Sequence, residues 1–81
     1  MARIREFYGE QRSSAPHPTE VDCDWQVVEA SNVRLLQLST YGSDHRQSKK
    51  KVSQTIQLDQ QAATVLMQIL KSTFPGAMPQ G

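Results

Sequence analysis

The sequence predicts an α+β fold, in which a three-stranded antiparallel β-meander is followed by one C-terminal amphipathic helix. Two observations predict it. Three stretches between residues 23 and 58 are rich in valine, leucine, isoleucine and aromatic residues with strand-like alternation, and a run of good helix formers follows them. At 81 residues the chain is long enough for one small domain. We expect a flexible arm over 1–22, the β-β-β-α domain over 23–76 and a disordered tail over 77–81.

The arm has no usable hydrophobic period. Its second half, "RSSAPHPTE", combines serine, proline and other polar residues as solvated linkers do. Ile4, Phe7 and Tyr8 are spaced for one short helical turn that docks on another surface, although a turn of this length is marginal alone.

The first two strands form a predicted hairpin, because "EASN" separates two apolar runs over about 24–29 and 33–41. In the second strand Leu36 and Leu38 share one face, whereas Val33 and Leu35 share the other. A strand with apolar residues on both faces sits inside a sheet or is covered by a second subunit. Val33 and Leu35 are therefore the predicted oligomer or partner interface.

The third strand is the clearest one, since Val52, Ile56 and Leu58 alternate with polar residues in "KVSQTIQLD". Asp59 is placed to cap the helix "QQAATVLMQILKS", and "FPG" is expected to end it. We expect the helix stripe to pack on one face of the sheet, with Leu66, Ile69 and Leu70 against Leu36, Leu38, Ile56 and Leu58.

Burial of so small a core barely offsets the conformational entropy that the chain loses on folding. We therefore expect a homodimer, in which a second copy adds buried surface. The N-terminal residues carry charges where a signal peptide has an apolar segment, and no apolar run is long enough to span a membrane. A cytoplasmic protein without membrane contact is the corresponding expectation.

Residues for catalysis or metal binding are sparse. Cys23 is the single cysteine, and its neighbours Asp22 and Asp24, even with His17, lack a metal-ligand spacing. Ser43, Asp44 and His45 adjoin in sequence, but adjacent residues do not form a catalytic relay. We therefore expect a protein without enzymatic activity, metal or cofactor.

Charge is distributed unevenly although the net charge is only +1. Residues 13–32 contain acidic residues and neither lysine nor arginine, whereas residues 33–58 contain five of the nine lysine and arginine residues. Clustered cations on one ribbon favour contact with phosphates. Alternatively, a lysine-rich hairpin tip only solubilises the ribbon and discourages strand pairing between molecules.

The stretch "RLLQLSTYGSDHRQSKKKVSQTIQLDQQAATVLMQIL" has the order strand, basic turn, strand and capped helix. In this it resembles the single-strand-binding transcriptional coactivators of the positive-cofactor-four type. That resemblance implies a homodimer that binds single-stranded DNA across its sheet. It also implies a set of DNA-contacting residues, namely Arg34, Tyr41, Arg46, Lys49, Lys50 and Lys51.

A protein-interaction module is the alternative. In this case the Val33 and Leu35 face, or a sheet edge, docks on a larger protein, and the arm folds on contact. A small adaptor or inhibitor of the phage or plasmid type would have this organisation.

Overall fold

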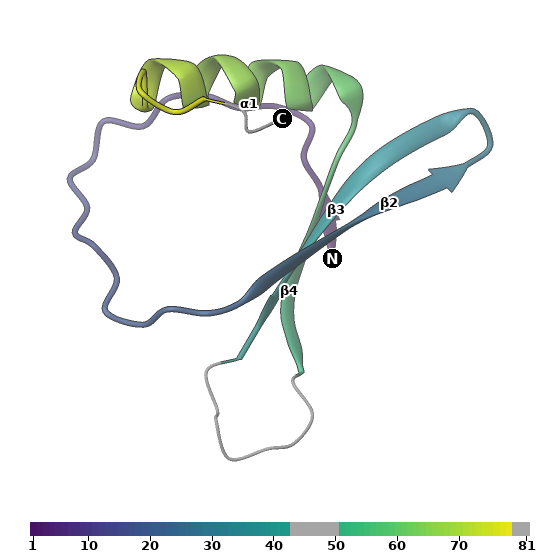
Figure 1. The fold of residues 1–81 in the computed structure, drawn as a ribbon, viewed down its shortest axis with the longest axis horizontal. Coiled ribbons are helices and arrows are strands. Elements are labelled where there is room, and N and C mark those ends of the chain that lie inside the picture. Colours follow the sequence, from purple (N-terminus) through teal and green to yellow (C-terminus); the bar gives the residue numbers. More distant parts are fainter. Residues whose placement is uncertain (43–50, 79–81) are drawn as a thin grey trace.

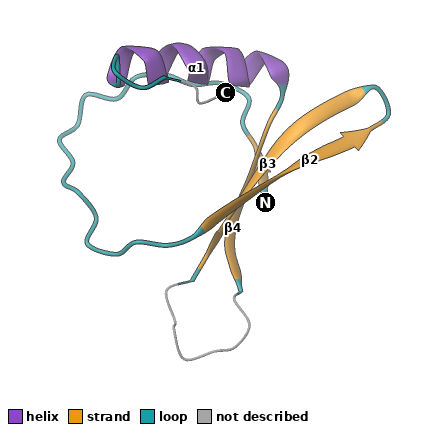
Figure 2. Cartoon of the chain, viewed as in Figure 1, coloured by secondary structure: helices purple, strands orange, loops and turns teal. Residues whose placement is uncertain are grey.

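The computed structural model describes residues 1–42 and 51–78. Within them, a four-stranded mixed sheet and one helix make an α+β fold (Figures 1 and 2). The elements are β1 (Ala2–Arg3), β2 (Cys23–Ala30), β3 (Val33–Tyr41), β4 (Val52–Leu58) and α1 (Gln60–Thr73). The order of the strands across the sheet is β1-β4-β3-β2.

The three predicted strands are present and antiparallel, as the sequence indicated. A two-residue turn joins β2 to β3, and its residues Ser31 and Asn32 have φ angles of 37° and 71°. Positive φ at both central positions is the conformation that matches the right-handed twist of a hairpin. The predicted connection at "EASN" is thus confirmed.

The predicted number of strands is wrong by one. Ala2 and Arg3 pair in parallel with Ile56 and Gln57 of β4, within the segment that the sequence indicated to be a flexible arm. The Ile4 backbone N–H extends this pairing to the Gln57 carbonyl at 2.9 Å. Two residues are too few to show the alternation of a strand, so the sequence did not reveal this one. Its presence depends on the free edge of β4.

The helix begins and ends where the sequence predicts. The Asp59 side chain accepts a hydrogen bond from the Ala62 backbone N–H at 2.8 Å, which satisfies one of the free amides of the first turn. The helix ends at Thr73, and Phe74 caps it by donating its N–H to the Leu70 carbonyl.

The expected packing of the helix on the sheet is not found within the chain. The helix approaches the sheet mainly at the end of β4, and its later turns extend away from the strands (Figure 1). Among residues 1–42 and 51–78, the buried apolar residues are Leu58 and Ala62, whereas Ile69 and Leu70 are exposed. Amphipathicity reveals which side of a helix is apolar but not which surface covers it.

The N-terminal segment runs along the first turns of the helix instead of forming the predicted helical turn. Phe7 is half-buried where it lies near Gln61, Ala62 and Val65, and Tyr8 is exposed. The long connection that follows, over residues 8–22, leads to β2 as irregular chain (Figure 2).

Candidate nucleic-acid interface

Tyr41 and Lys51 lie together at one end of the sheet. Tyr41 is paired with Val52 across β3 and β4, and the Gly42 N–H donates to the Lys51 carbonyl at 3.1 Å. A register shift at Thr40 and Tyr41 marks a β-bulge at this end. Three further predicted basic residues, Arg46, Lys49 and Lys50, lie outside the described residues, in the segment that joins these two strand ends.

One face of the sheet, here called the polar face, is built from hydrogen-bonding side chains. Strand alternation and register place the following residues on it: Arg3, Asp24, Gln26, Gln37, Ser39, Tyr41, Thr55 and Gln57. They form rows that cross the strands. Gln57 donates to the Gln37 side-chain oxygen at 2.8 Å, and the Ser39 and Thr55 hydroxyls are 3.3 Å apart.

The glutamine row continues to both edges of the sheet. Gln26 is in register with Gln37, and Arg3 is in register with Gln57. Sequence reasoning recognised the polar residues of β4 but missed Gln26, Gln37 and Arg3 as members of one surface. Alternation within each strand identifies a polar side, but only the pairing register reveals that the rows are continuous.

Tyr41 lies on the same face, and its hydroxyl is engaged in a hydrogen bond. Its phenol donates a hydrogen bond to the Asp24 carboxylate on β2. This hydrogen bond, with some desolvation and the negative charge of Asp24, raises the pKa of Tyr41 above its ordinary value. Tyr41 is half-buried, and the hydrogen bond to Asp24 restricts the orientation of its aromatic ring.

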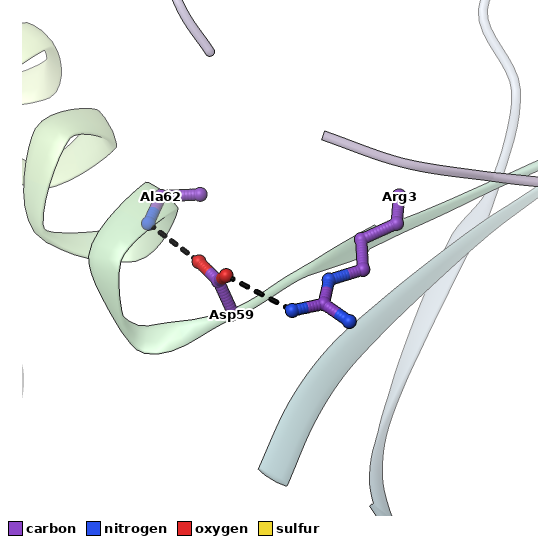
Figure 3. Close-up of polar contacts among 3 residues, drawn as sticks. All are labelled: Arg3, Asp59 and Ala62. Carbon is purple, nitrogen blue, oxygen red and sulfur yellow. Dashed lines mark hydrogen bonds and ion pairs between the residues drawn. The ribbon is translucent and has the colours of Figure 1, made fainter. Parts of the chain in front are cut away.

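Arg3 links the polar face to the start of the helix. Its guanidinium lies 3.2 Å from Oδ2 of Asp59, while Oδ1 of the same carboxylate accepts the Ala62 N–H (Figure 3). The Ala62 amide and then Arg3 lower the pKa of Asp59 below its ordinary value. The first strand and the helix are therefore joined through one carboxylate.

Arg34 does not join Tyr41 and Lys51. It lies near the start of β3, at the opposite end of the strand, and alternation places it on the other face. Its Nε and Nη2 atoms are 2.7 Å and 2.6 Å from Oε1 of Glu29, its neighbour on β2. The guanidinium thus has a partner within the hairpin.

Val33 and Leu35, the predicted interface, lie at the hairpin end of β3 and share the side of the sheet that carries Gln37. Their partners in register are Ala30 and Val28, so four small or medium apolar residues adjoin there. Val33 is exposed and Leu35 is half-buried.

The remaining candidates are the residues considered for metal binding and catalysis. No cluster of three or more His, Cys, Asp or Glu residues that could hold a metal ion occurs there. Cys23 is exposed, and the Thr19 backbone N–H donates to Nδ1 of His17 at 3.3 Å. Ser43, Asp44 and His45 lie outside the described residues.

No family model, curated protein or solved structure matches this chain. In residues 1–42 and 51–78, no helix combines the length and hydropathy required to cross a bilayer.

Proposed function

We propose that the chain is a non-enzymatic, cytoplasmic nucleic-acid-binding protein that takes a single strand along the polar face of its sheet. The observation that carries the proposal is the position of Tyr41 and Lys51. They lie where the lysine- and arginine-rich segment leaves the sheet, at the end of a face made of amide and hydroxyl side chains. Basic side chains that would contact phosphates therefore adjoin amide and hydroxyl side chains that would contact bases.

The chemistry favours a single strand over a duplex. Glutamine amides donate and accept hydrogen bonds, and an unpaired base offers its full edge to them. A tyrosine ring adds a surface on which a base stacks. The arginine and lysine residues would neutralise phosphates, and release of counterions would make the affinity depend on salt.

Fluorescence anisotropy of labelled single-stranded and duplex oligonucleotides, measured across a salt series, tests this function. We expect the Lys49→Ala, Lys50→Ala and Lys51→Ala triple variant to lose most of its affinity, with a salt slope smaller by up to about 2 for three phosphate contacts on a single strand. The control is Lys71→Ala, because Lys71 lies on the helix away from this end of the sheet. Unchanged binding by the triple variant, or no binding by the natural chain at low salt, contradicts the proposal.

A second set of variants separates the polar face from the basic segment. Gln37→Ala combined with Gln57→Ala removes the 2.8 Å amide pair without changing charge. We expect weaker binding with an unchanged salt slope, because hydrogen bonds to bases release no counterions. Arg34→Ala should weaken binding less than either set, since Arg34 is paired with Glu29 at the far end of β3. Full affinity in the double glutamine variant would mean that the nucleic acid does not bind along the polar face.

A protein-interaction module is the second candidate, favoured by the apolar cluster of Val28, Ala30, Val33 and Leu35 at the hairpin end. For this function Leu35→Glu should abolish capture of the partner protein, and the triple lysine variant should retain it. The opposite pattern, with nucleic-acid binding lost only in the lysine variant, selects the first candidate.

A further inference from the structure

The second face of the sheet, here called the apolar face, is open in the single chain. Register and alternation place on it Trp25, Val27, Leu36, Leu38, Ile56 and Leu58. Leu58 is only 2% exposed beneath the start of the helix, but Trp25 is 69% and Val27 53% exposed. A contiguous apolar patch of this kind is unusual on a monomeric protein and indicates a contact surface.

The helix also has an uncovered apolar surface. Its stripe is anchored at Ala62, which is 5% exposed, but Leu70 is 46% and the following Phe74 58% exposed. Met67, Leu70, Phe74 and Met78 line an apolar groove of about 600 Å³ at this end. Lys71 is the one charged residue of α1, and a helix poor in charge is typical of an interface core.

The helix is held away from the apolar face of its own chain. Only Asp59 separates β4 from α1, and the contacts of Asp59 with Arg3 and Ala62 fix the first turn (Figure 3). The remaining turns leave the strands (Figure 1), whereas the N-terminal segment lies against the first turns, near Gln61, Ala62 and Val65. The two apolar surfaces therefore belong to one chain but do not cover each other.

The exposed area is large enough for the interface of an obligate dimer. The chain exposes 7883 Å², whereas a compact monomer of 9.1 kDa exposes about 4,900 Å². The excess is about 3,000 Å² per chain, part of which belongs to the irregular connection over residues 8–22. An obligate homodimer buries about 1,000 to 2,500 Å² on each chain, so the excess is large enough to supply such an interface with one second copy.

We propose that two copies of this chain associate by reciprocal packing, in which the later turns of α1 from each copy cover the apolar face of the other. A two-fold arrangement satisfies both surfaces at once, because each contact of helix on sheet is repeated by symmetry, and it closes without leaving a free apolar surface. The residues at the centre of the apolar face are uncharged, and Arg34 at its hairpin end is paired with Glu29, so Lys71 meets no unpaired cation there. This interface differs from the Val33 and Leu35 surface and does not depend on nucleic-acid binding.

Sedimentation equilibrium between about 1 and 100 μM tests association, with an expected mass of twice 9.1 kDa. Leu70→Glu should raise the dissociation constant at least about tenfold, as expected for an anchor residue at the centre of an interface. Gln68→Glu, on the polar side of the same helix, is the matched control and should remain dimeric. A monomeric mass for the natural chain, or an undisturbed Leu70→Glu dimer, overturns the proposal.

Cross-linking establishes which surfaces meet. In a Cys23→Ser background, copies with Val27→Cys are mixed with copies carrying Leu70→Cys and treated with a short bismaleimide. Reciprocal packing predicts a cross-linked pair containing one copy of each kind, identified by mass. Cross-links restricted to pairs of Leu70→Cys copies would mean that the helices pack on each other, and would overturn the proposed arrangement even if the protein is dimeric.

Discussion

Leu58 is expected to contribute more to stability than any other residue of the described strands, because it is the most buried of them. It ends β4, is 2% exposed and lies opposite Leu36, next to Ala63 of the helix. Leu58→Ala removes buried carbon atoms and leaves a cavity, which costs about 2 to 5 kcal/mol. A domain of 81 residues has a total unfolding free energy of roughly 4 to 12 kcal/mol. The substitution therefore removes a large share of it.

Thermal and urea unfolding followed by circular dichroism measure this loss, at one fixed protein concentration because association also stabilises the fold. A decrease in Tm of at least about 8 °C is expected for a domain of this size. Val52→Ala is the control, because Val52 is exposed at the other end of the same strand and its truncation should cost less than about 1 kcal/mol. A cost for Leu58→Ala below that of Val52→Ala would refute the assignment of Leu58 to the core.

Two further predictions concern titrating groups. The pKa of Asp59 is lowered in the folded chain, so its carboxylate stabilises the fold above the unfolded pKa of about 3.9, and this stabilisation is lost as pH falls through the folded value. Asp59→Asn retains a capping side chain, so its Tm should decrease less at acidic pH than that of the natural chain. Asp59→Ala lacks the cap and should have a lower Tm at every pH. The same decrease of Tm at acidic pH in the natural chain and in Asp59→Asn would contradict this. The pKa of Tyr41 is raised by its hydrogen bond to Asp24, so the stabilisation is complete below the unfolded pKa of about 10 and is lost as pH rises through the folded value. Ultraviolet titration of the phenolate should show a late transition that Asp24→Asn shifts to lower pH, and an unshifted transition would exclude Asp24 as the cause.

The locally determined elements were predictable from the sequence. Alternation in "KVSQTIQLD" identified the strand that became β4, and the position of Asp59 before a run of helix formers identified both the cap and the start of α1. Each of these features depends on residues within a few positions of one another.

Features that depend on distant pairing were not predictable in the same way. The parallel strand at Ala2 and Arg3 has too few residues for a pattern and arises from the open edge of β4. Leu70 was predicted to pack on the chain's own sheet, because the sequence showed both an apolar helix stripe and an apolar sheet face. The capped turn at Asp59 instead directs the helix away from that face, and Leu70 is exposed. Arg34 was grouped with Tyr41 by the family resemblance, although the length of β3 separates them.

The two proposed surfaces are separable because they occupy opposite faces of one sheet. Side chains alternate along β3, so Gln37 and Ser39 point away from Leu36 and Leu38. A second copy that covers the apolar face leaves the polar face open, and a nucleic acid on the polar face meets none of the proposed dimer contacts. Dimerisation would still affect binding, since two polar faces in one particle engage a long strand together with higher effective affinity. A dimer-breaking variant should therefore bind a short oligonucleotide with its original affinity and a long one more weakly, whereas loss of both would mean that the nucleic acid reaches the apolar face.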